Sequence, residues 1–218
     1  MAMSAKKVFL QQIKPKFALP RRLKFNLRRI LDIGIANGSY EECKLIYPYA
    51  EYHGLDCVEH PIKMQSGDFF HLRDLESSHS ISSLPVKFDL IIANHVLEHI
   101  IDGERVFSDL CRQLTSGGIL YVEIPSIRTA SYLKKGRSYH FHDDPTHCTF
   151  YNLQRLSNIA IRNEYKVLSA GPISTPLKNL LSIPRALLSY VTGKDWGSKL
   201  IHLQKKVEHI MIRKNSSK

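Results

Sequence analysis

The sequence predicts an α/β protein built on a Rossmann-like, doubly wound and mostly parallel sheet with helices on both faces, plus a C-terminal helical extension. Two observations carry this prediction. Short apolar runs typical of strands alternate along the chain with segments of helical periodicity. A glycine-containing turn also joins the first predicted strand to the first predicted helix, and in such folds the ligand binds beyond the carboxyl ends of the strands.

The first half of the predicted sheet comes from three short segments. Residues 29–33 form an apolar run that ends at a glycine, and a helix is predicted directly after it over 38–46. Two glutamates in the first turn of that helix suit the positive end of the helix dipole. A second strand is predicted at 51–56 and a third at 68–70.

The second half of the sheet begins with the clearest strand signal in the chain. Residues 87–93 end in a continuous apolar run, and 103–115 then place apolar side chains on one helical face. Gly117 and Gly118 end that helix, because glycine adopts the left-handed cap conformation easily. The remaining elements are predicted as a strand at 119–124, a helix at 152–163 and a strand at 165–169.

Charge is distributed unevenly along the chain. The 218 residues carry 31 Lys and Arg against 20 Asp and Glu, a formal net charge of +11. The segments 1–30 and 171–218 together carry +16, which leaves the centre at −5. We therefore predict a basic segment over 1–27, a ligand-binding domain over 28–170 and a basic amphipathic helical extension over 171–218, with the basic ends serving to dock the protein.

Composition excludes several classes of protein. A content of 43% hydrophobic and 23% charged residues is ordinary for a globular domain and argues against disorder. No apolar run approaches the roughly 18 residues of a membrane span, and the N-terminal apolar stretch is too short for a signal peptide. The four cysteines are widely spaced without a C-x-x-C pair, so we expect reduced thiols in a cytoplasmic protein, either free or peripheral on the inner face of the membrane.

The glycine turn indicates what kind of ligand the sheet holds. Gly34 and Gly38 allow a tight bend and a close approach of the ligand, but Ala36 breaks the G-x-G-x-x-G pattern of dinucleotide binding. Asp32 would repel a diphosphate and suits a cationic ligand such as S-adenosylmethionine. Asp56 lies about 20 residues further on, where an acid accepts hydrogen bonds from ribose hydroxyls. The alternative is a plain turn with two surface acids.

With these motifs the sequence resembles the class I S-adenosylmethionine-dependent methyltransferases over residues 28–170. The segment 31–38 is similar to the family's D-x-G-x-x-x-G loop, and the segment 88–125 is similar to its fourth strand, Leu-Glu-His turn, Gly-Gly turn and fifth strand. The resemblance implies a methyltransferase that uses S-adenosylmethionine. The cofactor contacts that it implies are Asp32, Gly34, Asn37, Gly38, Asp56, Cys57, Asp68, Phe69, Asn94 and His95.

Two histidine-rich motifs follow predicted strands. His95 to His99 spells H-x-x-E-H, an arrangement found in one class of zinc peptidase, but a Leu-Glu-His turn directly after a buried strand explains it better. The second motif, 140–148, holds three histidines and two aspartates that could bind a divalent ion or cap the next helix. No metal ligand is assigned in either motif.

The second motif also contains the predicted catalytic residues. Asp144, His147 and Tyr151 resemble the D-x-x-H-x-x-x-Y/F pattern of a branch of small methyltransferases associated with glycan and lipid-linked sugar modification. His142 and His147 are therefore predicted to remove the proton from an acceptor hydroxyl, because an imidazole with a pKa near ~7 suits that task. A substrate contact, a structural role and a metal role remain alternatives.

The C-terminal extension gives the predicted partners. Trp196, Leu200, Leu203, Val207 and Ile210 recur at helical spacing beside lysines. This helix could pack on its own domain, lie on an anionic membrane or form a homodimer. The sequence shows no platform of stacking aromatic residues, which argues against nucleic acid as a partner.

The function predicted from the sequence is methylation of an oxygen on a sugar or another small acceptor, lipid-linked or free. Two alternatives belong to other classes. One is a metal-dependent hydrolase that uses the His140–His147 cluster, and the other is a non-catalytic adaptor with a methyltransferase-like fold that binds a polyanion or a membrane.

Overall fold

A computed structural model of the chain describes residues 14–23, 26–35, 38–131, 140–173 and 207–215. The strands are β1 (Arg29–Ile33), β2 (Glu51–Asp56), β3 (Phe69–Leu72), β4 (Phe88–Asn94), β5 (Leu114–Pro125), β6 (Tyr165–Pro172) and β7 (Val207–Lys214). The helices are α2 (Pro15–Arg21), α3 (Ser39–Ile46), α4 (Gly103–Arg112) and α5 (Leu153–Arg162), with short 3-10 helices η1 (Leu97–His99), η2 (Ile127–Ser131) and η3 (Phe141–Asp143).

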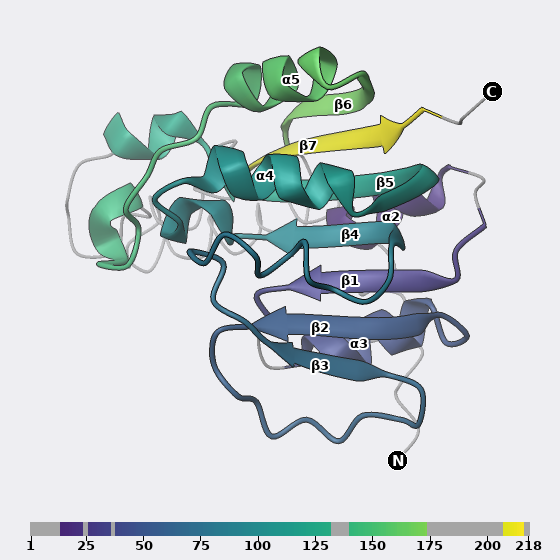
Figure 1. Cartoon of the computed structure of the whole chain (residues 1–218). Helices are drawn as coiled ribbons and strands as arrows, with labels where there is room; N and C mark the ends of the chain where they lie inside the picture. Colours follow the sequence, from purple (N-terminus) through teal and green to yellow (C-terminus); the bar gives the residue numbers. More distant parts are fainter. Residues whose placement is uncertain (1–13, 24–25, 36–37, 132–139, 174–206, 216–218) are drawn as a thin grey trace, which may run out of the picture.

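The seven strands form one sheet in the order β3-β2-β1-β4-β5-β7-β6 (Figure 1). Strands β3, β2, β1, β4 and β5 pair in parallel, whereas β7 runs antiparallel to both of its neighbours, β5 and β6. Helices α4 and α5 cover one face of this sheet, and α2 and α3 cover the other (Figure 1). The predicted α/β architecture, with a mostly parallel sheet and helices on both faces, is confirmed.

Alternation along the strands divides the core into two layers. Leu31 of β1 and Ile91 of β4 belong to the layer under α4 and α5, whereas Ile30 and Leu90 belong to the layer that α2 and α3 cover. Successive side chains of a strand point to opposite faces, so one continuous apolar run supplies both layers. This explains why the buried strands have no polar alternation in the sequence.

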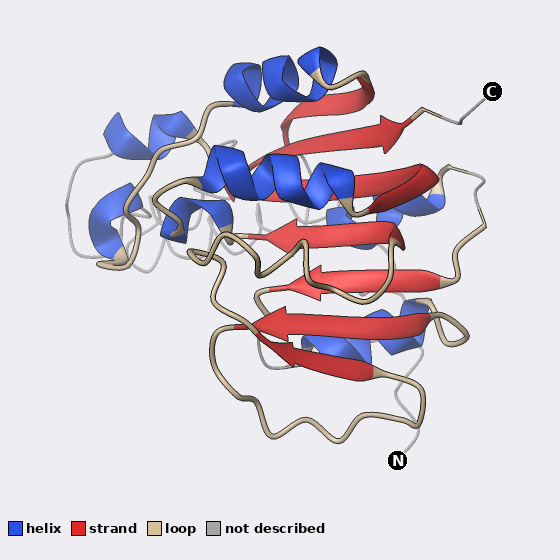
Figure 2. Ribbon diagram, viewed as in Figure 1, coloured by secondary structure: helices blue, strands red, loops and turns tan. Residues whose placement is uncertain are grey.

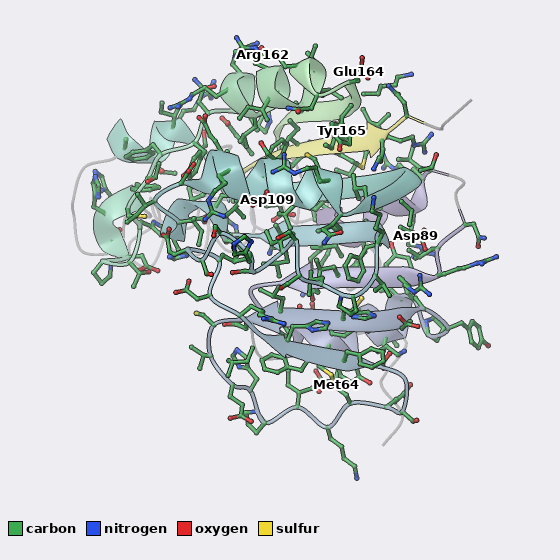
Figure 3. All side chains as sticks on the ribbon, in the orientation of Figure 1. Met64, Asp89, Asp109, Arg162, Glu164 and Tyr165 are labelled. Atoms are coloured by element: carbon green, nitrogen blue, oxygen red, sulfur yellow. The ribbon has the colours of Figure 1, made fainter. Side chains whose placement is uncertain are left out.

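At the amino end of the sheet, the side chain of Asp89 binds backbone N–H groups at the start of β1. Asp89, at the start of β4, accepts hydrogen bonds from the backbone N–H groups of Arg28 and Arg29, at 2.9 and 3.0 Å. Figure 3 shows Asp89 at the end of β4 opposite to the arrowheads of the parallel strands. These bonds fix the entry to β1, and the carboxyl end of the sheet is left for ligand binding.

The predicted C-terminal helix is wrong for the part of it that the structure describes. Val207 and Ile210 lie in strand β7, which inserts between β5 and β6, and Ile210 is fully buried. Ile210 and Ile212 pack in one core layer and Met211 in the other, as successive residues of a strand do, whereas a spacing of three and four residues suggested a helix. Trp196, Leu200 and Leu203 lie outside the described residues.

The N-terminal segment also belongs partly to the domain. Phe17 of α2 is 1% exposed and packs with Ile30 and Tyr52 in the core layer on that side of the sheet. The sheet and its packing therefore extend from α2 to β7, beyond the predicted boundaries of 28 and 170. No helix among the described residues is both long enough and apolar enough to cross a bilayer.

Candidate functional site

A cavity of about 340 Å³ opens at the carboxyl ends of β1, β2 and β4. In Figure 2 the arrowheads of the parallel strands point to the side where loops and short helices gather. The polar residues that line the cavity are Asp56, Arg73, Asp74, His95, His99 and Thr146, and its apolar wall includes Leu55, Leu75, Val96 and Ile100. A volume of this size falls within the range of small-molecule sites.

The turn after β1 forms one wall of the cavity. Gly34 has a φ of 70°, and its N–H donates to the carbonyl oxygen of Leu55 at 2.9 Å. A Cβ at this position would lie 2.7 Å from Cγ2 of Val96. Glycine is therefore required at position 34 by both backbone conformation and space. Gly38 also has a positive φ of 84° at the start of α3, and Asn37 lies outside the described residues.

Asp32 supports this turn from below and is not among the residues that line the cavity. Its Oδ2 accepts hydrogen bonds from Oγ of Ser39, at 2.6 Å, and from the hydroxyl of Tyr52, at 3.0 Å. Burial raises the pKa of Asp32, although Lys16 and the two hydrogen bonds act in the opposite direction. The structure thus places the predicted acid where it holds the turn to α3 and β2.

Asp56 ends β2 and lies in the cavity wall. One of its oxygens accepts a hydrogen bond from the N–H of Val58 at 3.1 Å, and the other lies 3.2 Å from Nε2 of His60. The loop after β2 therefore fixes the orientation of this carboxylate. Cys57 follows it, is exposed and also lines the cavity.

Asp68 and Phe69 do not reach the cavity, and their predicted place beside the ligand is not supported by the geometry. Phe69 begins β3 opposite His53 in β2, so Phe69 and Asp68 lie three and four residues, or ~10 and ~13 Å, before the carboxyl end of β3. Asp68 instead accepts hydrogen bonds from the hydroxyl of Tyr40 and from Nζ of Lys44. Phe69 stacks on His53, at 4.8 Å between ring centroids.

Arg73, Asp74 and Leu75, and not the predicted Asp68 and Phe69, lie at the cavity after β3. All three line the cavity, and the N–H of Arg73 donates to the carbonyl oxygen of Asp56. The sequence prediction missed them because it took 68–70 as the whole strand. A strand that starts at 69 and ends at 72 would have identified 73–75 as the ligand-facing loop.

The turn after β4 brings a charged pair to the cavity. His95 has a φ of 56° and lines the cavity, and its Nδ1 lies 2.9 Å from Oε1 of Glu98. Burial lowers the pKa of His95, but the hydrogen bond and charge of Glu98 and the charge of Glu123 raise it, and the net pKa is raised. Asn94 ends β4, and its Oδ1 is buried without a hydrogen-bond partner among the described residues.

The two histidine motifs of the sequence meet at the rim of the cavity. The rings of His99 and His147 are 4.7 Å apart between centroids, in an edge-to-face arrangement. Oγ1 of Thr146 lies 2.8 Å from Nδ1 of His99 and 2.6 Å from Oδ1 of Asp144. The backbone of the 140–151 segment is attached to the same turn, because the N–H groups of Cys148 and Thr149 donate to the carbonyl oxygen of Glu98.

The predicted catalytic histidines differ in their surroundings. Nδ1 of His147 donates to the carbonyl oxygen of Phe141 at 2.7 Å, and its side chain is 15% exposed. His142 is exposed, and its ring contacts are with His140, Phe141 and Phe150. His147 thus lies against His99, which lines the cavity, although His147 itself is not a lining residue, whereas the ring contacts of His142 are with residues of its own loop.

Tyr151 anchors the 140–151 segment to the start of α4. Its hydroxyl accepts a hydrogen bond from the N–H of Gly103 at 2.7 Å and donates to the carbonyl oxygen of Ile100 at 2.8 Å. The ring is 4% exposed, and a Cβ on Gly103 would lie 2.6 Å from it. The D-x-x-H-x-x-x-Y pattern therefore combines a residue that packs against His99, His147, with a buried anchor, Tyr151.

Comparisons with known proteins agree with this geometry. A sequence model of the family described as "Methyltransferase domain" matches residues 6–170. Among curated proteins, none matches the sequence significantly. Many solved structures share the fold.

One similar structure is an S-adenosylmethionine-dependent methyltransferase from Archaeoglobus fulgidus, with 21% identity and a TM-score of 0.59 over 97% of this chain and 100% of that one. A second is phosphoethanolamine N-methyltransferase 2 of Haemonchus contortus, in complex with phosphomonomethylethanolamine and S-adenosylhomocysteine, with 16% identity and a TM-score of 0.62 over 92% of this chain and 52% of that one. A third is a Haloferax volcanii methyltransferase in complex with the Trm112 methyltransferase activator, with 13% identity and a TM-score of 0.66 over 96% of this chain and 92% of that one.

Proposed function

Because this chain belongs to the methyltransferase domain family and is a class I S-adenosylmethionine-dependent methyltransferase, we propose that it methylates a hydroxyl oxygen of a sugar or another small acceptor, lipid-linked or free. The observation that carries this proposal is the pair of imidazoles formed by His99, which lines the cavity, and His147, which packs against it. Family membership favours methyl transfer over the hydrolase and adaptor alternatives.

The residues of the cavity suit the cofactor. Asp56 presents a carboxylate at the end of β2, where it can accept hydrogen bonds from ribose hydroxyls. Gly34 lets the ligand approach the backbone of the turn, and Leu75, Val96 and Ile100 offer an apolar surface to the adenine. Asp56 and Asp74 also place negative charge near a cationic ligand, whereas a diphosphate would be repelled.

S-adenosylmethionine supplies a methyl group on a positively charged sulfur, which keeps the electron pair of the carbon–sulfur bond when the acceptor oxygen bonds to the carbon. The task left to this chain is to hold the acceptor in line and to promote loss of the hydroxyl proton. His147 is held in the tautomer that can accept the hydroxyl proton at Nε2. Since Nδ1–H donates to Phe141, Nε2 of the neutral ring carries a lone pair.

The two imidazoles of His99 and His147 favour an oxygen acceptor over an amine. A hydroxyl oxygen is a weak nucleophile until its proton leaves, so two imidazoles beside the methyl-transfer site are useful to it. A neutral amine already has a reactive lone pair and needs less assistance. We assign no catalytic role to His142, because it is exposed and contacts aromatic residues of its own loop.

The test is incubation of the purified full chain with methyl-labelled cofactor and separated glycolipid, small-molecule, RNA and protein fractions of a cell extract. We expect label in the glycolipid or small-molecule fraction, with an O-methyl group identified in the product by NMR spectroscopy. His147→Gln should lower kcat at least tenfold, and His142→Gln should leave it unchanged. Label confined to RNA or protein, or an N-methyl product, would contradict the proposal.

We further propose that the basic flanking segments attract the enzyme to the anionic inner face of the cytoplasmic membrane, where a lipid-linked acceptor would be found. The support is their charge of +16, set against −5 in the centre of the chain. Sedimentation with anionic vesicles should therefore weaken as salt concentration rises. Equal binding to neutral vesicles would refute this localisation.

A further inference from the structure

We propose that Glu98, His99 and His147 form a binding site for one divalent metal ion of the zinc class, beside the cavity that His99 lines and with one coordination position left open. One ligand atom from each of these three side chains lies within 4.8 Å of the other two. The site combines residues from both histidine motifs, which are separated by almost fifty residues in the sequence. Neither motif supplies a complete ligand set on its own.

Glu98 provides the first argument, because it is a buried carboxylate that is only half satisfied. The residue is 0% exposed, and Oε1 accepts the hydrogen bond from His95. Oε2 is buried and has no hydrogen-bond partner in the part of the chain that the structure describes. A buried carboxylate oxygen without a partner is strongly unfavourable, and a cation beside it removes that penalty.

The hydrogen-bond network provides the second argument, because it fixes the tautomers of both histidines. The carboxylate of Asp144 can only accept, so the hydroxyl of Thr146 donates to it and must accept from His99. Nδ1 of His99 therefore carries the hydrogen. Nδ1 of His147 carries it as well, because its partner is the carbonyl oxygen of Phe141.

Both rings thus keep Nε2 as the lone-pair nitrogen available to a metal. Metal-binding histidines commonly donate their other N–H to a carboxylate, a backbone carbonyl or a similar acceptor, which fixes the ring and raises its basicity. His147 has this support directly from Phe141, and His99 has it through the Thr146–Asp144 pair. The outer partners of a metal site are therefore already in place.

The ligand set selects the class of ion. Two imidazoles and one carboxylate suit zinc and its neighbours in the first transition series, whereas magnesium and calcium prefer oxygen ligands. A tetrahedral zinc site places its ligand atoms about 3.3 Å apart, so small rotations of the side chains would close the cluster around the ion. Three protein ligands with one open position is the arrangement of catalytic rather than structural zinc.

The proposed ion has a chemical use that rests on the proposed function. An acceptor hydroxyl bound at the open position would have a lower pKa, as metal-bound water does. Its O–H bond breaks, the electron pair stays on oxygen and the proton passes to solvent. The role of His147 in promoting proton loss is then that of a metal ligand.

The experiment measures metal binding by the purified full chain, without acceptor. We expect isothermal titration with Zn²⁺ to give one site, Co²⁺ at that site to show visible absorption bands, and Mg²⁺ not to compete. Glu98→Gln keeps the size of the side chain and an acceptor for His95 but removes the charge, so Zn²⁺ affinity should fall at least about tenfold. His147→Gln should do the same, while His142→Gln in the same loop serves as the matched control.

The outcomes separate this proposal from the proposed function. Absence of Zn²⁺ binding by the wild-type chain, or an equal loss of affinity in His142→Gln, would overturn the metal site. A far-UV circular dichroism spectrum and a cooperative urea transition like those of the wild type would show that the Glu98→Gln variant is folded. An O-methylation activity that persists after complete removal of metal would overturn the catalytic use of the ion and leave the O-methyltransferase proposal standing.

Discussion

Replacing Tyr151 by Phe should destabilise the protein without affecting its cofactor cavity. The change removes only the hydroxyl, which accepts from the N–H of Gly103 and donates to the carbonyl oxygen of Ile100. Both groups are buried, so neither gains water when the hydroxyl is lost. An unsatisfied buried polar group costs about 1–3 kcal/mol, and the ring itself keeps its packing. We therefore expect the free energy of unfolding to fall by about 1–3 kcal/mol.

Urea denaturation followed by circular dichroism measures this change directly. For a domain of this size each kcal/mol should also lower the melting temperature by about 2–4 °C. Tyr49→Phe is the matched control, because Tyr49 is 98% exposed and should lose almost nothing. A loss below about 0.5 kcal/mol in Tyr151→Phe, or an equal loss in the control, would refute the view that this hydroxyl anchors the segment to α4.

Three further predictions concern the turn after β1 and the titration of buried groups. Gly34→Ala places a Cβ against Val96 at a φ of 70°, and we expect a loss of about 1–3 kcal/mol and weaker binding of S-adenosylhomocysteine by calorimetry. Gly67→Ala, which has a positive φ but open space, should cost less, and equal losses would count against the steric argument. Burial beside another histidine and an arginine lowers the pKa of His71 to about 4, so the wild type should lose about 1–2 kcal/mol as pH falls from 6.5 towards 4. His71→Gln should flatten that dependence in urea titrations, and an unchanged slope would contradict it. Burial raises the pKa of Asp32, so folding favours its protonated form and the stability of the wild type declines as pH rises above 3.8. The free energy of unfolding of Asp32→Asn, measured relative to that of the wild type, should therefore increase over that pH range. A relative free energy of unfolding that is lower at pH 7 than at pH 4 would refute this.

The sequence predicts the first two parallel strands well because each is a short segment with a local stop, whereas the bounds of β3 and β5 differ from the prediction. Residues 29–33 and 51–56 are strands with the predicted bounds, since a glycine or an aspartate ends each of them. Strand β7 was missed because its pairing with β5 and β6 is a long-range event. Its residues carry no turn signal that distinguishes a strand from a helix.

For the candidate site, too, the sequence predicts the residues whose position depends on local structure and not the contacts that depend on long-range folding. Gly34, Asp56 and His95 line the cavity because each ends or directly follows a strand, and this property is visible in the sequence. The meeting of His99 with His147 depends on how the 140–151 segment folds back over the turn after β4. That path is fixed by backbone hydrogen bonds to Glu98, which no spacing of residue types reveals.

The position of β7 has a consequence for how the protein is made. Because residues 207–214 supply the strand between β5 and β6, a growing chain that lacks them presents two unpaired strand edges. Such edges are templates for pairing with other chains, so nascent and truncated forms would be substrates for chaperones and proteases. Substitutions that weaken β7 should therefore reduce the amount of protein in a cell more strongly than they reduce the activity of each folded molecule.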